Sequence, residues 1–523
     1  MRRPPFLLPS ALLLALGLST QAASTLAVCT DAAPESFDIV QTELAASNDA
    51  AGMTVFDQLL RFKPGTTELM PSLASNWEIS KDGLQYTLHL RRGVKFHTTP
   101  WFTPSRDMNA DDVLFSINRL YDPKHPAHAV AKSGYAYWSG MEMSKLIKAV
   151  SKVDDYTVRF VLNHPEAPFL SDLAMSPIGS VYSAEYGTQL IQRGQLEQLS
   201  SQPVGTGPFV FKRYQQNELI RYAANTSYWD GAPKVDNLVF AITVNDDTRA
   251  QKVKAGECQV ALLLKPTAVE TFKGDPKTRV LQSTPLATAF LAINTQHRVL
   301  KDQRMREALS IAIDKDTYLQ VIRGGMGKAA ANFLPPSIWS HDASLKNRLD
   351  RERARQLAKA AGYDGSTLHL FVDNSGISAR AGELLQGDWA KAGIKVEVEV
   401  MELSTMFKRG GKGEHDLMLM SWYGDNGDPD NFFTPNLSCS SVGNSNKAQW
   451  CDQPFEDLIT AARRSNDLKQ RTALYQQAQR RVYDQVPVIP LTYSVVINAV
   501  SKRVNGYVPS PLNVSDFRRV SLN

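Results

Sequence analysis

The amino-acid sequence predicts an α/β protein built as two lobes. Strand-like runs dominate the first half of its 523 residues, whereas strands and helices alternate from about residue 285 to residue 490. The end of the chain, from Val496 to Val508, returns to strand and turn. The most economical arrangement places both ends of the chain in one lobe and inserts the alternating segment as the other lobe. Crossovers near residues 284–288 and 491–496 would then join the lobes, and such a molecule can open and close about a hinge.

The N-terminus has the pattern of a secretory signal peptide over residues 1–22. Two arginines precede an apolar run at residues 6–19, and a small-residue sequence follows at residues 20–22. The apolar run is too short for a membrane-spanning anchor, and no other segment reaches about 18 apolar residues. A buried N-terminal helix is the alternative. We therefore expect an exported, periplasmic protein that begins near residue 23.

Length and composition indicate a globular protein of two or three domains. The chain is too long for one ordinary core, and its residues are 43% hydrophobic and 21% charged. The formal net charge is only +5, of which two units belong to arginines in the leader. No dense run of lysine and arginine is present, so we expect no nucleic-acid partner.

The chain contains four cysteines, and an even number in an exported protein indicates two disulfides. Cys439 and Cys451 would close a short loop rich in Ser and Asn, which leaves Cys29 to pair with Cys258. Zinc is the alternative, but no C-x-x-C motif exists and no histidine stands at ligand spacing from a cysteine. The residues before Cys29 resemble a lipoprotein box. However, Val28 is too large for its position and lipidation would leave Cys258 unpaired, so we expect no lipid anchor.

The individual elements follow from hydrophobic periodicity. Alternation of apolar and polar residues predicts strands in the first half at Tyr86–His97, Tyr156–Leu162 and Asn237–Val244. In the second half, helical spacing together with start and stop signals predicts helices at Asp302–Asp314, Asp350–Tyr363, Ser378–Ile394, 455–467 and 468–486. Strands are predicted between them at Leu368–Val372, Lys395–Val400 and Leu417–Tyr423. This alternation favours a lobe with a parallel sheet at its core.

Several long motifs, taken in order, resemble the extracytoplasmic solute-binding proteins of peptide ABC importers, family 5. The resemblance spans essentially the whole mature chain. It is carried by Leu73–His97, Asn109–Leu120, Pro203–Tyr214, Tyr228–Asp236 and Arg304–Asp316. Within the family, the segment Gly424–Phe433 and the spacing of the cysteines are most similar to the dipeptide-binding members.

The resemblance implies a two-lobed clamshell fold of the type II-like periplasmic binding proteins. Lobe I would comprise residues 23–284 and 495–523, with an extra β-rich subdomain at roughly 60–200, and lobe II would comprise residues 285–494. The implied function is that of the periplasmic substrate-binding component of an ABC importer. It would capture di- and tripeptides in a closing cleft and deliver them to the permease subunits in the inner membrane. We expect a monomer without cofactor or metal.

The segment Leu417–Phe433 runs from an apolar strand straight into a group of aspartates. A peptide enclosed in a dry cleft loses water from its ammonium, its carboxylate and its amide groups, so each must find a partner. A carboxylate at the end of a buried strand can pair with the ammonium, while the strand itself pairs with the amides. By resemblance, Asp425 pairs with the α-amine, and Trp422, Tyr423 and Gly424 line the ligand.

The opposite face of the cleft is expected from Thr42–Ala45, which includes Glu43 and Leu44. Each assignment has a simpler structural alternative. Asp425 would be a solvated loop cap and Trp422 would pack in the core. Asp428 and Asp430 are favoured as turn formers rather than ligand contacts. A calcium loop does not fit, since the proline and aromatic residues of the segment interrupt the required alternation of oxygen ligands.

One departure from the dipeptide-binding pattern concerns the ligand's carboxylate. Members of that subgroup usually carry an arginine in a proline-rich loop after the strand that matches Leu368–Val372. Here the loop is shorter and has no arginine at that place. Arg380 is the nearest cation, on the following helix. Either Arg380 or a residue from elsewhere supplies the charge, or the ligand is longer, amidated or otherwise not a plain dipeptide.

Two alternative functions are compatible with parts of the sequence. An enzyme would need catalytic carboxylates such as those of a glycosidase, which the aspartates imitate in sequence. No G-x-S-x-G or H-E-x-x-H motif is present, and the glycine-rich segment Gly324–Ala330 lacks the Ser or Thr of a phosphate loop. The second rival keeps the fold but binds another ligand, such as a modified peptide, an opine, haem or a metal chelate.

Overall fold

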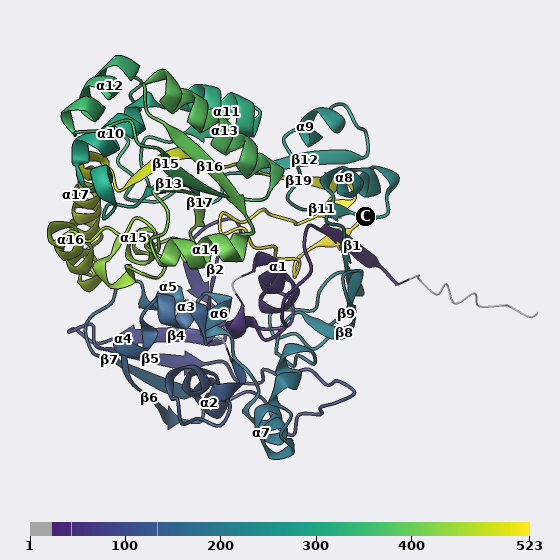
Figure 1. Cartoon of the computed structure of the whole chain (residues 1–523). Coiled ribbons are helices and arrows are strands. Elements are labelled where there is room, and N and C mark those ends of the chain that lie inside the picture. The colour runs from purple at the N-terminus through teal and green to yellow at the C-terminus, as the bar shows by residue number, and fades with distance from the viewer. Residues whose placement is uncertain (1–22, 43, 133) are drawn as a thin grey trace, which may run out of the picture.

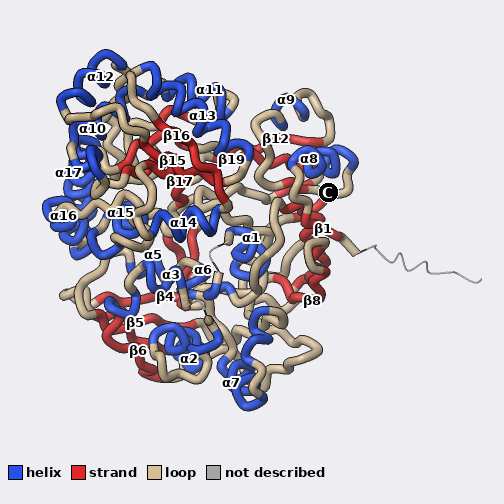
Figure 2. The backbone as a smooth tube through the Cα atoms, viewed as in Figure 1, coloured by secondary structure: helices blue, strands red, loops and turns tan. Residues whose placement is uncertain are grey.

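The computed structural model describes residues 23–42, 44–132 and 134–523. The signal peptide expected at residues 1–22 lies outside the described residues, as does Glu43. Three sheets of four or more strands, counted over the described ranges, organise the molecule (Figure 1). We call the part built on the sheet of β1 lobe I, the part built on the sheet of β13 lobe II, and the part built on the sheet of β5 the subdomain. Figure 2 shows helices clustered on lobe II, whereas strands and loops make up much of the rest.

The sheet of lobe I takes strands from both ends of the chain. Its order is β12 (Thr278–Ser283), β19 (Val496–Ser501), β11 (Val260–Ala261), β1 (Thr25–Thr30), β10 (Asn237–Ile242), β9 (Leu219–Ala224) and β8 (Phe209–Gln215). β1 pairs in parallel with β10 and β11, and the other pairs are antiparallel. The short pairs β2 (Leu60–Phe62) with β3 (Leu69–Pro71) and β20 (Val504–Asn505) with β21 (Ser521–Leu522) lie outside this sheet. Helices of this lobe are α1 (Ala45–Ser47), α8 (Asp246–Ala255) and α9 (Ala268–Thr271).

The subdomain is an antiparallel sheet with short helices around it. Its strands run in the order β4 (Ala74–Ile79), β5 (Gln85–Leu90), β7 (Thr157–Leu162) and β6 (Ile147–Asp154). Its helices are α2 (Ala110–Tyr121), α3 (Ala136–Gly140), α4 (Met143–Leu146), α5 (Phe169–Asp172), α6 (Ser176–Gly179) and α7 (Ala184–Arg193). The start of α2 is fixed by a capping box in which the side chains of Asn109 and Asp112 accept hydrogen bonds from the backbone.

Lobe II is a sheet covered by helices on both faces. Its order is β14 (Lys328–Ala329), β18 (Val488–Tyr493), β13 (Ala287–Ile293), β17 (Leu417–Tyr423), β15 (Leu368–Asp373) and β16 (Val396–Met401). The helices are α10 (Gln303–Ala312), α11 (Lys315–Arg323), α12 (Arg351–Ala360), α13 (Gly376–Lys391), α14 (Leu403–Gly411), α15 (Asp430–Leu437), α16 (Gln453–Arg464) and α17 (Leu468–Gln485). Successive residues of β13 alternate between two cores: Leu291 packs with α10, α12 and α13, and Phe290 packs with α15, α16 and α17.

The parallel core expected for lobe II is only partly present. β15 runs parallel to β16 and to β17, but β13 is antiparallel to both of its neighbours, β17 and β18. The reason is connectivity. The chain enters lobe II along β13 from β12 of lobe I and leaves along β18 to β19 of lobe I, so these two strands must run in opposite directions. The two connections between the lobes pass through residues 284–286 and 494–495.

Candidate functional site

β17 leaves the core of lobe II within its last three residues. Its first four residues are buried, whereas Ser421 and Tyr423 are exposed, the latter by 42%, and Trp422 is half-buried. The strand therefore carries a dry, well-packed base and a solvent-facing end. Trp422 packs against the core cluster that α15 to α17 build on this side of the sheet.

One backbone edge of β17 is open near its end. On one side, β17 pairs with β13 along its whole length, from Leu417 to Tyr423. On the other side, the described register with β15 contains only Leu417 and Met418. Among the described strands, none covers this edge from Leu419 to Tyr423. An open edge of this kind presents N–H and C=O groups that can pair with another extended chain.

Asp425 is the second residue after the end of β17. Its carboxylate accepts a hydrogen bond of 3.2 Å from the phenol of Tyr137, in α3 of the subdomain. Its backbone N–H donates to the side-chain oxygen of Asn431 at 3.0 Å. The side chain is half-buried. Asp425 is thus a positioned carboxylate, held between lobe II and the subdomain.

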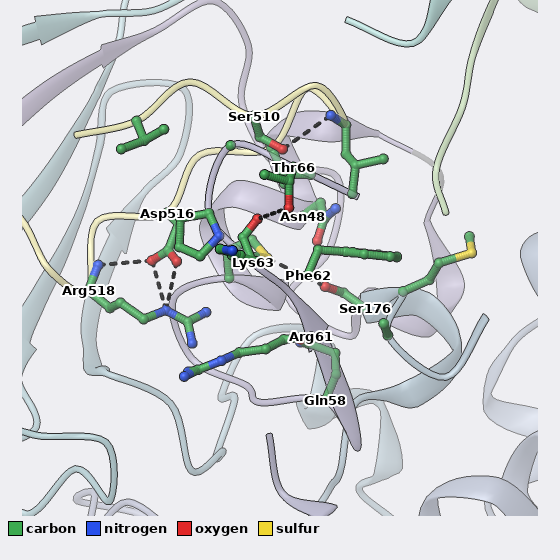
Figure 3. A pocket seen from close by; sticks show the side chains of 18 of the residues that line it. Asn48, Gln58, Arg61, Phe62, Lys63, Thr66, Ser176, Ser510, Asp516 and Arg518 are labelled. Carbon is green, nitrogen blue, oxygen red and sulfur yellow. Dashed lines mark hydrogen bonds and ion pairs between the residues drawn. The ribbon is translucent and has the colours of Figure 1, made fainter. Parts of the chain in front are cut away.

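Asp425 and Tyr137 form part of the wall of a cavity of about 260 Å³, which we call the lobe I cavity. Figure 3 shows its other walls, which come from β2, from α6 and from the C-terminal segment. Asp516 and Arg518 form an ion pair of 2.8 Å there. Arg61 also lines the cavity and pairs at 3.0 Å with Asp230, which is not among the described lining residues. Charges of both signs therefore face this space.

The loop after β17 packs closely against neighbouring residues at its two glycines. The N–H of Gly424 donates to the carbonyl of Leu286 at 2.6 Å, and a Cβ at Gly424 would stand 2.7 Å from the ring of Phe432. Gly427 has a φ of +74°, and a Cβ there would stand 2.4 Å from Thr67 of lobe I. A side chain at either position would displace the loop.

Asp428 and Asp430 do form turns, as the sequence predicts, but they are also buried in ion pairs. The N–H of Asp428 donates to Asn426, and the N–H of Asp430 donates to Asp428. Arg471 in α17 contacts the Asp428 carboxylate at 2.7 Å. Arg463 in α16 lies 3.8 Å from Asp430. Ion pairs with α16 and α17, which come after α15 in the chain, therefore hold the loop in place.

Two carboxyl groups of the subdomain, Asp172 and Glu166, also lie beside this loop and its arginine partners. Asn426 donates a hydrogen bond of 2.7 Å to Asp172, and Arg463 lies 3.9 Å from Glu166. Burial raises the pKa of Asp172 to about 8. Burial also raises the pKa of Glu166 and of Asp430, while the guanidinium of Arg463 opposes both shifts. Within the described residues, no group of three or more His, Cys, Asp or Glu side chains is arranged to hold a metal ion.

A second cavity of about 260 Å³, which we call the lobe II cavity, borders the open edge of β17. Leu419, Met420 and Ser421 line it from the strand, and residues of α11, α13 and α14 line it from the other sides. Among the described residues that line it, Arg323 is the basic one and Asp373 the acidic one.

The model of the bacterial extracellular solute-binding proteins, family 5, matches residues 68–444. The chain belongs to this family. Di/tripeptide-binding protein 4 of Pseudomonas aeruginosa (strain UCBPP-PA14) is 50% identical to it over 525 residues, which cover 98% of each chain.

Solved structures of family 5 proteins share the fold. A dipeptide-binding protein from Pseudoalteromonas sp. SM9913, in complex with Met-Leu, superposes with a TM-score of 0.87 at 32% identity, covering 95% of this chain and 100% of the other. The ABC transporter-associated periplasmic binding protein DppA from Helicobacter pylori, in complex with the peptide STSA, has the same TM-score at 35% identity, covering 95% and 98%. The two-lobed α/β fold expected from the sequence is confirmed.

The remaining family-derived residues lie in different places. Leu44 precedes α1 in lobe I, with its side chain exposed. Arg380 is exposed on α13 and is not among the described residues that line either of the two cavities. Disulfides join Cys29 to Cys258 beside β1, and Cys439 to Cys451 between α15 and α16. Among the described helices, none is both long and apolar enough to cross a bilayer.

Several residues of this family 5 site gave no signal in the sequence. Tyr137 stands 288 positions before Asp425, and nothing near it in the chain marks it. In the sequence, Arg471 and Arg463 occupy polar positions of amphipathic helices. Nothing there indicates that they form ion pairs, because their carboxylate partners belong to other elements. Only the fold brings these groups together.

Proposed function

We propose that this chain is the substrate-binding component of an ABC importer and that its ligands are peptides of two or three residues. Support comes from the relatives, because one is named a di/tripeptide-binding protein and one solved structure contains the dipeptide Met-Leu. We further propose that the protein has no enzymatic activity and acts as a monomer in the periplasm after removal of residues 1–22. It would deliver its ligand to the permease subunits in the inner membrane.

The observation that carries the proposal is the open edge of β17 leading into Asp425. The ligand would add to this edge as a short strand, so that its amides pair with backbone groups of Leu419–Tyr423. Its ammonium would pair with the carboxylate of Asp425, which Tyr137 orients. Selectivity would then depend on the end charge more than on the side chains, because backbone groups are the same in every peptide.

Binding would be accompanied by closure of the lobes. The two short connections at residues 284–286 and 494–495 support a hinge between them. We propose that residues 23–284 and 495–523 move together as lobe I, with the subdomain at roughly 60–200, and that residues 285–494 move as lobe II. Trp422, Tyr423 and Gly424 would line the ligand, and Leu44 with its neighbour Glu43 would face it from lobe I.

A thermal-shift panel of peptides tests the proposal. A ligand at one hundred times its dissociation constant stabilises the protein by about 2.7 kcal/mol. Free di- and tripeptides should raise the melting temperature, whereas N-acetylated peptides should not, because they lack the ammonium. Asp425→Asn should abolish the response, and Asp316→Asn, at an exposed position on α11, is the matched control. Equal binding of acetylated and free peptides would exclude the ammonium site, and hydrolysis products would indicate an enzyme.

A further inference from the structure

The lobe II cavity has a mainly apolar wall, to which Leu419 and Met420 of β17 contribute. Three apolar side chains that line it are nevertheless largely exposed in this structure: Ile377 by 49%, Leu403 by 49% and Phe407 by 40%. Apolar side chains grouped at the rim of a cavity favour an apolar occupant that covers them.

Arg323 gives this apolar cavity a positive charge. It is the last residue of α11, and its Nε is buried without a hydrogen-bond partner among the described residues. Across the described part of the chain, no ion pair of its guanidinium is found within 4.0 Å, although Asp373 lines the same cavity. The Asp373 carboxylate is instead engaged by Ser378 and by the backbone of Ser375. A buried guanidinium donor without a partner is costly, which favours an anionic ligand group.

A simpler role for Arg323 is structural: a basic side chain at a helix C-terminus stabilises the helix by interacting with its dipole. However, the helix end is closed by backbone groups: the N–H of Gly325 bonds to Leu319, and Gly324 adopts the left-handed conformation. The guanidinium is not needed for this cap. Its charge acts instead on Tyr423: partial loss of hydration raises the pKa of the Tyr423 phenol, and the Arg323 guanidinium opposes that rise.

Geometry connects the cavity to the open strand edge. An extended chain advances about 3.3 Å per residue, so a di- or tripeptide covers about 7–10 Å, the length of two to three strand residues. A ligand whose ammonium lies at the Tyr423 end of β17 would therefore bring its carboxylate beside Ser421, which lines the lobe II cavity.

We propose that Arg323 binds the C-terminal carboxylate of the peptide and that the lobe II cavity takes an apolar side chain on that last residue. This inference rests on the peptide function proposed above. It assigns to α11 the charge that the shortened loop after β15 does not supply, and it leaves Arg380 without a ligand role. The ligand class is a short peptide with a free carboxylate and an apolar C-terminal residue.

Isothermal titration of Ala-Leu, Ala-Leu amide and N-acetyl-Ala-Leu tests the assignment. Wild type should bind Ala-Leu about 10- to 100-fold more tightly than the amide, as expected for a charge-assisted hydrogen bond. Arg323→Gln should lower the affinity for Ala-Leu by this factor while changing that for the amide less than about threefold. Arg380→Gln should leave the acid-to-amide ratio unchanged, and Arg323→Lys, which keeps the charge, should fall between wild type and Arg323→Gln.

The outcomes separate the two proposals. If wild type discriminates against the acetylated peptide but Arg323→Gln retains the acid-to-amide ratio, the role of Arg323 is wrong and the peptide function stands. The same holds if Arg380→Gln alone removes the ratio. If wild type binds Ala-Leu no better than its acetylated form, the ammonium site at Asp425 is wrong, and the acid-to-amide ratio alone decides the role of Arg323. If wild type binds neither peptide, the peptide function fails and the Arg323 inference fails with it.

Discussion

The amide of Asn426 in lobe II donates a hydrogen bond of 2.7 Å to a side-chain oxygen of Asp172 in the subdomain, and both side chains are buried. This contact lies one residue beyond Asp425, the proposed ammonium partner. It therefore joins the loop that follows β17 to the neighbouring part of the molecule at the position where a ligand would be held.

Asp172 should make stability depend on pH. Burial raises its pKa from 3.8 to about 8, so the folded protein keeps a proton that the unfolded chain releases above pH 4. The resulting stabilisation is complete below pH 4 and is lost as the pH rises through 8. Relative to Asp172→Asn, which keeps an oxygen acceptor for Asn426, wild type should lose up to about 1.4 kcal/mol per pH unit within this range. Denaturation of both proteins at pH 5 and pH 8 measures the difference, and parallel profiles would contradict it.

Tyr137→Phe should weaken peptide binding without unfolding the protein. The change removes the phenol that donates to Asp425 at 3.2 Å but keeps the ring. Because this bond is already made without ligand, only its contribution to orienting the carboxylate is lost on binding, about 1.4 kcal/mol at most, so the dissociation constant should rise by up to about tenfold. Titration calorimetry measures this change, with Tyr121→Phe as the control on α2 of the same subdomain. An unchanged constant would mean that Tyr137 does not orient the carboxylate.

Arg471→Met should destabilise the fold strongly. It leaves the buried carboxylate of Asp428 without the guanidinium that contacts it at 2.7 Å. Breaking a buried ion pair by removing one partner costs about 3–5 kcal/mol. The double variant with Asp428→Asn should recover part of this loss, because it removes the unpaired charge. Thermal denaturation of both variants tests the coupling, and strictly additive losses would argue against it.

Gly427→Ala should disturb the contact between the loop and lobe I. The residue has a φ of +74°, and its Cβ would stand 2.4 Å from Thr67. Both the strained backbone and the collision oppose the substitution. Gly393→Ala, at a φ of +77° with open space around it, is a matched control that carries the backbone strain alone. We expect a larger drop in melting temperature for Gly427→Ala, and equal drops would show that the Thr67 contact contributes nothing.

The sequence was most informative where local chemistry decides the structure. The helices predicted to start at Asp302 and Asp350 begin there, because each side chain accepts a hydrogen bond from a backbone N–H of the first turn. The sequence was least informative where distant segments decide it. The direction of β13 follows from the connections to lobe I, which periodicity does not record. Likewise, the burial of Asp428 depends on Arg471, 43 positions away.

The two disulfides join cysteines that are neighbours in chain order, the first with the second and the third with the fourth. A chain exported N-terminus first, as proposed above, would present Cys29 and Cys258 to the periplasm before Cys439 has crossed the membrane. Oxidation in order of appearance therefore yields the native connectivity directly. Such a chain should mature with an oxidase alone and gain little from an isomerase, even though its first bond spans 229 residues.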